Sequence, residues 1–140
     1  AKNLNVLQPI RNILEATALR NASKKFSGED IARLENQIQI MKKGAKAKDV
    51  RAVTEADIKF HLITMEVAAS NHTLQIWKSV HSRIRLEFYR IGPLPSLAQQ
   101  AIDHQVLLDI LLHGSPTKID KSIHAHIFDS VANALKNNSA

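Results

Sequence analysis

Residues 53–67 read VTEADIKFHLITMEV and contain the pattern that decides how this chain folds. At about 100° per residue, the apolar residues of this stretch fall on one arc of a helix, and charged residues such as Glu55 and Lys59 fall on another. Asp57 and His61 lie one helical turn apart at the edge of the apolar arc. A carboxylate that faces the interior is costly unless it is paired or ligated. The pattern therefore predicts a buried partner for Asp57.

Two later segments offer further imidazoles. His104 lies at the centre of an apolar helical stripe, where a histidine either donates to a backbone carbonyl or ligates a metal. His124 and His126 lie on opposite edges of the last apolar face, about 160° apart, so only one of them can join the site, and periodicity does not choose between them. One carboxylate and three imidazoles suit a divalent ion such as Zn²⁺ or Ni²⁺.

The remaining histidines carry weaker signals. His81 lies in the middle of a predicted helix and is a reserve ligand. His72 follows a predicted helix start, and His113 lies in a last helical turn, where a cation suits the helix dipole. We expect His72 and His113 at the surface.

Helix-forming residues dominate the chain, and its four glycines and four prolines fall between periodic segments. We therefore predict an all-α protein, an antiparallel bundle of six to seven helices joined by short connections. Ser27 with Asp30 forms a capping box, Asn71 is a predicted N-cap, and Ser115 with Pro116 opens the last helix. The expected helices cover residues 6–23, 27–44, 48–69, 71–90, 96–113 and 116–136, with a break at 92–95.

Length and composition favour one cysteine-free domain over residues 1–140. Without cysteine there is neither a disulfide nor a thiolate metal site, and a cytoplasmic location is the simplest expectation. No apolar run approaches the roughly 18 residues that span a bilayer, and no charged segment followed by an apolar stretch indicates a secretory signal. We expect no membrane association.

The net charge of +6 raises the question of nucleic-acid binding. Part of the excess is a local cluster between two predicted helices, which we interpret as a solvated connection. Aromatic residues that could stack on bases do not alternate with the basic ones. Basicity alone therefore does not predict a DNA-binding domain. The cluster comprises Lys42, Lys43, Lys46, Lys48 and Arg51.

The histidine pattern resembles a known family. The sequence DIKFH at residues 57–61, followed by AASN at 68–71, resembles the D-x-x-F-H … s-x-N signature of the FCD domain, the C-terminal effector-binding domain of GntR-type bacterial transcriptional regulators. Asp103-His104 stands where that family typically has Glu-His, and His126 follows 22 residues later, at the spacing of its last metal-binding histidine. The sequence RNILE at residues 11–15 is similar to the family's R-x-x-L-E opening. The resemblance extends from about residue 7 to residue 131.

This resemblance implies a bundle of six or seven helices that forms a homodimer. It implies a divalent metal, Zn²⁺ or Ni²⁺, held by Asp57, His61, His104 and His126. Effectors of the family are commonly small organic acids, which coordinate the metal through its open positions. A nearby guanidinium would bind such an anion by charge and paired hydrogen bonds. Arg11 is our candidate for this contact, with Arg83 and Arg85 in reserve.

Regulators of this class carry a winged helix-turn-helix domain before the bundle, and nothing in residues 1–140 corresponds to it. We therefore expect a single effector-binding and dimerisation domain that contacts DNA only through a separate N-terminal domain. Asp103 in place of Glu could alter the groups that orient His104.

Two other functions compete with a metal-dependent sensor. A mononuclear metal hydrolase needs a positioned general base, yet the chain has no His-Glu-x-x-His or paired Glu-x-x-His motif. A plain helical interaction module would keep the same histidines satisfied in its core. The sequence favours the sensor, and we predict that the chain is not an enzyme.

Overall fold

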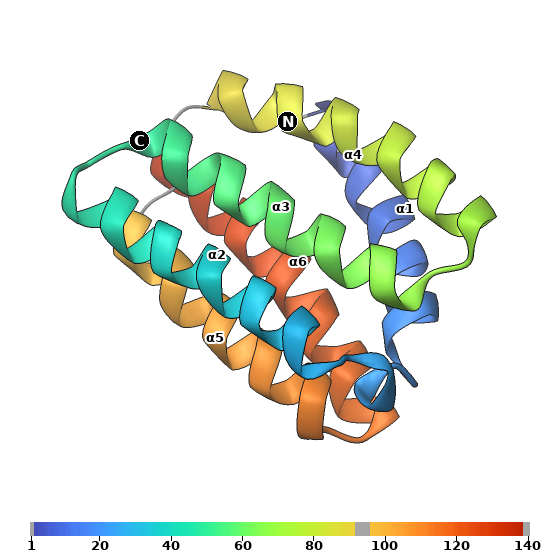
Figure 1. Cartoon of the computed structure of the whole chain (residues 1–140). Coiled ribbons are helices and arrows are strands. Elements are labelled where there is room, and N and C mark those ends of the chain that lie inside the picture. The colour runs from blue at the N-terminus through green and yellow to red at the C-terminus, as the bar shows by residue number, and fades with distance from the viewer. Residues whose placement is uncertain (1, 92–95, 139–140) are drawn as a thin grey trace.

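The computed structural model describes residues 2–91 and 96–138, with side chains described for 3–91 and 96–129. This described part consists of helices and contains no strand. The six helices confirm the predicted all-α class (Figure 1). In chain order the elements are α1 (Lys2–Leu19), a 3₁₀ turn η1 (Ser23–Lys25), α2 (Gly28–Lys46), α3 (Val50–Ala68), α4 (Asn71–Ile91), α5 (Leu97–His113) and α6 (Pro116–Asn138).

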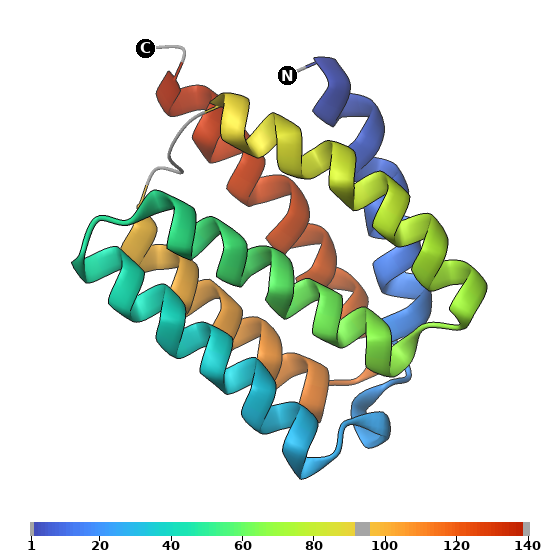
Figure 2. The ribbon, with the colours of Figure 1, turned by 45° about the horizontal axis from the view of Figure 1, so that its top comes forward.

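The helices form two groups joined by α6. Helix α2 packs against α3 and α5, while α1 packs against α4 and α6. Figure 2 shows α6 running between these groups, with its last turn at the same end of the bundle as the first turn of α1. Helices α1 and α6 are therefore antiparallel. The main apolar core is built on fully buried side chains from several helices, including Leu34, Ile38, Phe60, Ile63, Leu108 and Leu111.

Polar side chains define where the helices begin. The Ser27 hydroxyl accepts from the Asp30 N–H at 3.1 Å, and the Asp30 carboxylate accepts from the Ser27 N–H at 3.0 Å, so the predicted capping box is present. Ser115 accepts from the Lys118 N–H at 3.2 Å, which confirms the predicted start of the last helix. The Asp49 carboxylate caps α3 by accepting from the Ala52 N–H at 3.0 Å, a cap that was not predicted.

Several predicted helix ends and one predicted cap were wrong. Helix α1 begins at Lys2 and ends at Leu19, before the turn η1. Asn71 is the first residue of α4 and does not cap it, because the hydroxyl of Ser70 accepts from the Thr73 N–H. Helix α2 continues past Gly44 to Lys46. The predicted break at 92–95 lies outside the described residues.

Gly44 marks a close approach of two helices and does not end one. A Cβ atom at this buried position would lie 2.8 Å from Cγ2 of Val53 on α3. The absence of a side chain therefore lets α2 and α3 pack closely while α2 continues for another half turn. The basic side chains that follow in this connection are exposed, as predicted. Among the described helices, none is both long and apolar enough to cross a membrane.

Gly114→Ala is expected to destabilise the protein by about 1–3 kcal/mol, the usual cost of overpacking. A Cβ atom at Gly114 would lie 2.7 Å from the carbonyl oxygen of Ile110, and backbone cannot move aside cheaply. Gly28→Ala is the matched control, because no atom lies within 4 Å of its Cβ position and alanine favours the helix. Urea unfolding of both variants measures the difference, and equal stabilities would contradict this assignment.

Candidate metal centre

Helix α3 turns two polar side chains into the bundle. Asp57 is 8% exposed and His61 is 2% exposed, although the charged residues of the same helix face outward. His104 on α5 is completely buried, and His126 on α6 is partly buried. One ligand atom from each of these four residues lies within 4.8 Å of the other three. Three helices therefore bring together the residues proposed from the sequence.

Hydrogen bonds already connect these side chains to one another. Oδ1 of Asp57 lies 2.7 Å from Nε2 of His104 and 3.3 Å from Nε2 of His61. Nε2 of His61 also lies 3.1 Å from Nε2 of His126. The same ring nitrogens that face Asp57 are the ones that would face a metal ion. Protons on these nitrogens would have to leave when an ion binds.

The Nδ1 atoms of His104 and His61, on the far side of each ring from the cluster, are also hydrogen-bonded. Nδ1 of His104 donates to the carbonyl oxygen of Gln100 at 2.6 Å, and Nδ1 of His61 donates to Oε1 of Glu15 at 3.0 Å. The other oxygen of Glu15 accepts from Nε of Arg11 at 2.5 Å. Such bonds fix the tautomer of a ligating histidine and direct its remaining nitrogen toward the ion. Arg11 and Glu15 therefore belong to the support of the site.

Both buried carboxylates remain charged. Burial alone would raise the pKa of Glu15, but Arg11 and His61 beside it hold that pKa well below its ordinary value of 4.5. Burial would likewise raise the pKa of Asp57, and the His104 and His61 rings hold it well below 3.8. Asp57 thus presents a carboxylate, the form that binds metal, throughout the neutral range.

The imidazoles differ in their proton affinity. Burial lowers the pKa of His61, yet the neighbouring carboxylates of Glu15 and Asp57 raise it above 6.5 overall. Burial lowers the pKa of His126 well below 6.5, and the nearby His104 and His61 rings add to that effect. His126 is therefore neutral with an available nitrogen, the form required of a ligand.

This donor set fits a divalent metal ion. Ligands bound at about 2.0–2.1 Å lie roughly 3.4 Å apart in a tetrahedral shell, so the four ligand atoms, which lie within 4.8 Å of one another, would move closer together when an ion binds. The nitrogen and oxygen donors suit Zn²⁺ or Ni²⁺, and the orienting bonds to His61 and His104 are already formed. The ion would place two positive charges next to the Asp57 carboxylate, which in the metal-free protein is stabilised by the His104 and His61 rings.

The three arginines proposed for the effector lie in different environments. Arg11 is 3% exposed and close to the cluster, where its Nε is bonded to Glu15. Arg83 and Arg85 lie on the exposed side of α4, where Arg83 bonds Ser79 and Arg85 bonds Glu55. The structure brings only Arg11 near the histidines.

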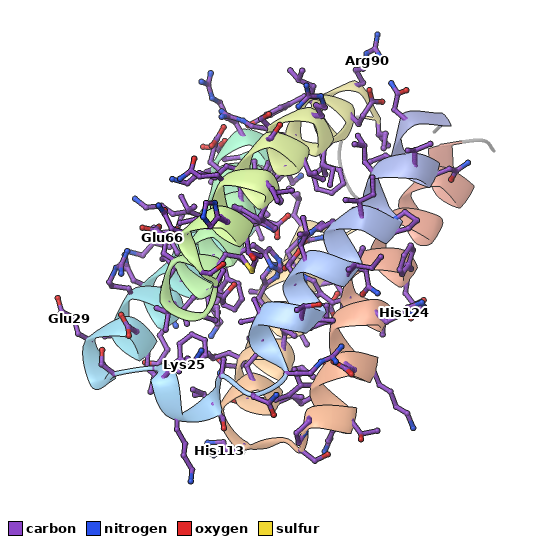
Figure 3. The ribbon with its side chains drawn as sticks, turned by 90° about the vertical axis from the view of Figure 1, so that its right-hand side faces the viewer. Lys25, Glu29, Glu66, Arg90, His113 and His124 are labelled. Atoms are coloured by element: carbon purple, nitrogen blue, oxygen red, sulfur yellow. The ribbon has the colours of Figure 1, made fainter. Side chains whose placement is uncertain are left out.

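The remaining histidines and Asp103 lie outside the cluster. His81 is buried against the ring of Trp77, with the centroids 4.5 Å apart, and is not one of the clustered residues. Figure 3 shows His124 pointing away from the bundle on α6 and His113 at one end. His72 and His113 are exposed, as predicted. Asp103 bonds Gln99, so the group that orients His104 is the Gln100 carbonyl and not Asp103.

The roles of Glu15, Gln100 and Trp77 were not predicted from the sequence. A signal for Glu15 exists, because Arg11 and Glu15 are four residues apart and share the buried face of α1 with Leu4 and Gln8. Two opposite charges on an apolar face indicate a buried pair. No comparable signal marks the Gln100 carbonyl, since any helix offers backbone acceptors at every residue.

Comparisons with known proteins identify the family and the fold. Residues 7–129 match the model of the family described as the FCD domain. The galactonate operon transcriptional repressor of Escherichia coli (strain K12) is 25% identical over 112 residues, which are 79% of this chain and 48% of the repressor. The chain thus spans about half the length of this relative. A solved structure described as the metal-free FCD domain of TM0439 has a TM-score of 0.77 at 16% identity and covers 97% of this chain and 94% of its own, and it shows the same fold.

Glu15→Gln is expected to weaken metal binding by about 10- to 100-fold, the usual effect of removing a carboxylate that orients a ligating histidine. The amide keeps the shape of the side chain but loses the charge that faces Nδ1 of His61. Competition with a chromogenic chelator measures the affinity. Glu35→Gln, on the exposed side of α2, should bind metal as the unchanged protein does. Equal affinities for both variants would contradict the role of Glu15.

The metal-free protein should lose stability as the pH falls from about 6.5 to 3. Burial, with the charge of Arg11, lowers the pKa of His81 to about 3, so between that value and 6.5 the unfolded chain binds a proton that the folded chain does not. This difference lowers the free energy of unfolding by up to ~1.4 kcal/mol per pH unit. His81→Phe keeps a ring against Trp77 and should reduce the slope of the pH dependence in urea unfolding, to which His126 also contributes. His72→Phe should retain it, and a wild-type slope in His81→Phe would contradict the prediction.

Proposed function

Because the chain belongs to the FCD domain family, whose members are effector-binding domains of transcriptional regulators, we propose that it senses a small organic acid at a divalent metal ion. The ion is held by Asp57, His61, His104 and His126. The observation that carries this proposal is the convergence of four ligand atoms from three helices, with two of the imidazoles already oriented from behind.

The proposed ion is Zn²⁺ or Ni²⁺. Four protein ligands complete a tetrahedral shell, but either ion also accepts five or more ligands. A carboxylate and a neighbouring hydroxyl of an effector would occupy the added positions. The effector would then bind only to the metal-loaded domain, because its charge is attracted by the ion and would be repelled by Asp57 alone.

Polar groups on α1 and α4 support an effector site beside the metal. Gln8 is 2% exposed, one turn before Arg11 on the same face, and both atoms of its amide lack a hydrogen-bond partner. The indole nitrogen of Trp77 is likewise buried without a partner. Unpaired buried polar atoms are costly, and a polyhydroxylated ligand would satisfy them. Arg11 uses Nε for Glu15, so its terminal nitrogens would contact the carboxylate.

The name of the Escherichia coli relative refers to an operon for galactonate, a hydroxylated carboxylic acid. That chemistry matches an ion, a guanidinium and unpaired amide and indole groups. We propose a sugar acid or a related hydroxy acid as the effector class for this domain.

We propose that the domain acts as a cytoplasmic homodimer and changes operator binding by a separate DNA-binding domain. The exposed side of α1 supports a partner, because Val6, Ile10 and Ile13 are exposed there and no exposed residue between Asn3 and Leu19 is charged. An uncharged stripe lets two copies of a basic chain meet without charge repulsion. Effector binding would shift the packing of α1 and so the spacing of the paired DNA-binding domains.

A hydrolase is less well supported than a sensor. A general base needs a pKa near the working pH, and the carboxyl beside the site, Glu15, has a strongly lowered pKa while bonded to Arg11 and His61. Asp57 is itself a proposed ligand. Neither Glu15 nor Asp57 is therefore a poised base.

The test uses Trp77, which is the single tryptophan and lies beside His81. Galactonate and other hydroxy acids are titrated into zinc- or nickel-loaded domain while tryptophan fluorescence and melting temperature are followed. A binding acid should change the fluorescence saturably and stabilise the fold by about 2.7 kcal/mol at 100 times its dissociation constant. His104→Ala and chelator-treated protein should show neither effect. Equal responses without metal would refute a metal-dependent sensor.

A further inference from the structure

A groove of about 440 Å³ runs between α5 and α6 and reaches the metal ligands from one side. His126 lines this groove and is the least buried of the four clustered residues, since the others are 8% exposed or less. Gln100 also lines it, and the carbonyl of that residue accepts from Nδ1 of His104. The groove therefore ends against the cluster itself.

The charge of the groove is opposite to that of the whole chain. Asp103 and Asp129 line it, and none of the described lining residues is lysine or arginine. The chain carries a net charge of +6, so a dication is repelled by most of the protein surface and attracted here. The same carboxylates repel an organic anion, which separates this side of the site from the side of Arg11.

The side chain of Gln100 adds a second feature. Gln100 is 7% exposed and lines the groove, and its backbone carbonyl is held by Nδ1 of His104. Its position in the groove gives a carbonyl oxygen that can replace a water molecule of a hydrated ion. An amide oxygen is a weaker ligand than imidazole for Zn²⁺ or Ni²⁺, so an ion held there would pass on to the histidines.

We propose that this groove is the route by which a divalent cation reaches and leaves the cluster of Asp57, His61, His104 and His126. Asp103 and Asp129 attract the ion, and Gln100 receives it before His126. The inference rests on the proposed metal site and adds the path to it.

The first experiment narrows the groove. Ala125 lines it and is exposed, so Ala125→Trp places a large ring in the path. Stopped-flow mixing with Zn²⁺, and release to excess chelator, give the two rate constants. A blocked route slows uptake and release by the same factor and leaves the dissociation constant unchanged. Ala98→Trp is the matched control, because Ala98 is exposed on α5 and does not line the groove.

The second experiment removes the charge without adding bulk. The double variant Asp103→Asn, Asp129→Asn should take up Zn²⁺ roughly threefold to tenfold more slowly at low salt and should lose most of the salt dependence of uptake, as expected for electrostatic steering. Asp109→Asn, on the exposed side of α5 and outside the groove, should behave as wild type.

The outcomes separate the route from the site. Wild-type rates in both the tryptophan and the double asparagine variants would overturn the route while the metal site stands. Equal slowing in the Ala98 and Asp109 controls would also overturn it. Protein that binds no Zn²⁺ or Ni²⁺ at all would refute the proposed function itself.

Discussion

The carboxylate of Asp57 is the constraint on which the centre of this bundle depends. It is buried and charged, and a charge in that position requires partners. Two imidazoles from α3 and α5 meet the same oxygen, and a third from α6 meets the first imidazole. The packing of these three helices is therefore fixed by polar contacts as well as by apolar burial, and a metal ion would take the place of the protons between them.

Behind the ligands, a chain of contacts leads to α1. Arg11 bonds Glu15, and Glu15 bonds the ring of His61. Because Glu15 is buried with charges on both sides, a change in one contact alters the others. An effector that draws the Arg11 guanidinium toward itself would weaken the hold on Glu15 and move α1 relative to α3. The same helix carries the exposed apolar stripe that we assign to the dimer, so a mechanical link from ligand to partner follows from the proposed contacts.

Much of this architecture is predictable from local patterns. The single-arc distribution of charge on α3 places Asp57 and His61 inward, and the Ser27 and Ser115 caps follow from short-range chemistry. The choice of His126 over His124 is different, because both lie at edges of one apolar face and only the neighbouring helices distinguish them. Gly44 misled the prediction of the end of α2 for a similar reason, since close helix packing and helix termination both favour glycine. For Arg83 and Arg85 the sequence could not distinguish two roles, because an arginine serves equally well in a surface ion pair and in a contact to a bound anion.

The separation of the ligands along the chain has a consequence for folding. Asp57 and His104 are 47 residues apart, and His61 and His126 are 65 residues apart. An ion bound among them cross-links distant segments of a chain that has no cysteine. Unlike a disulfide, this cross-link forms only once the helices have assembled, and it persists under reducing conditions. The domain would thus gain a reversible cross-link, and its free energy of unfolding would rise with the concentration of free metal.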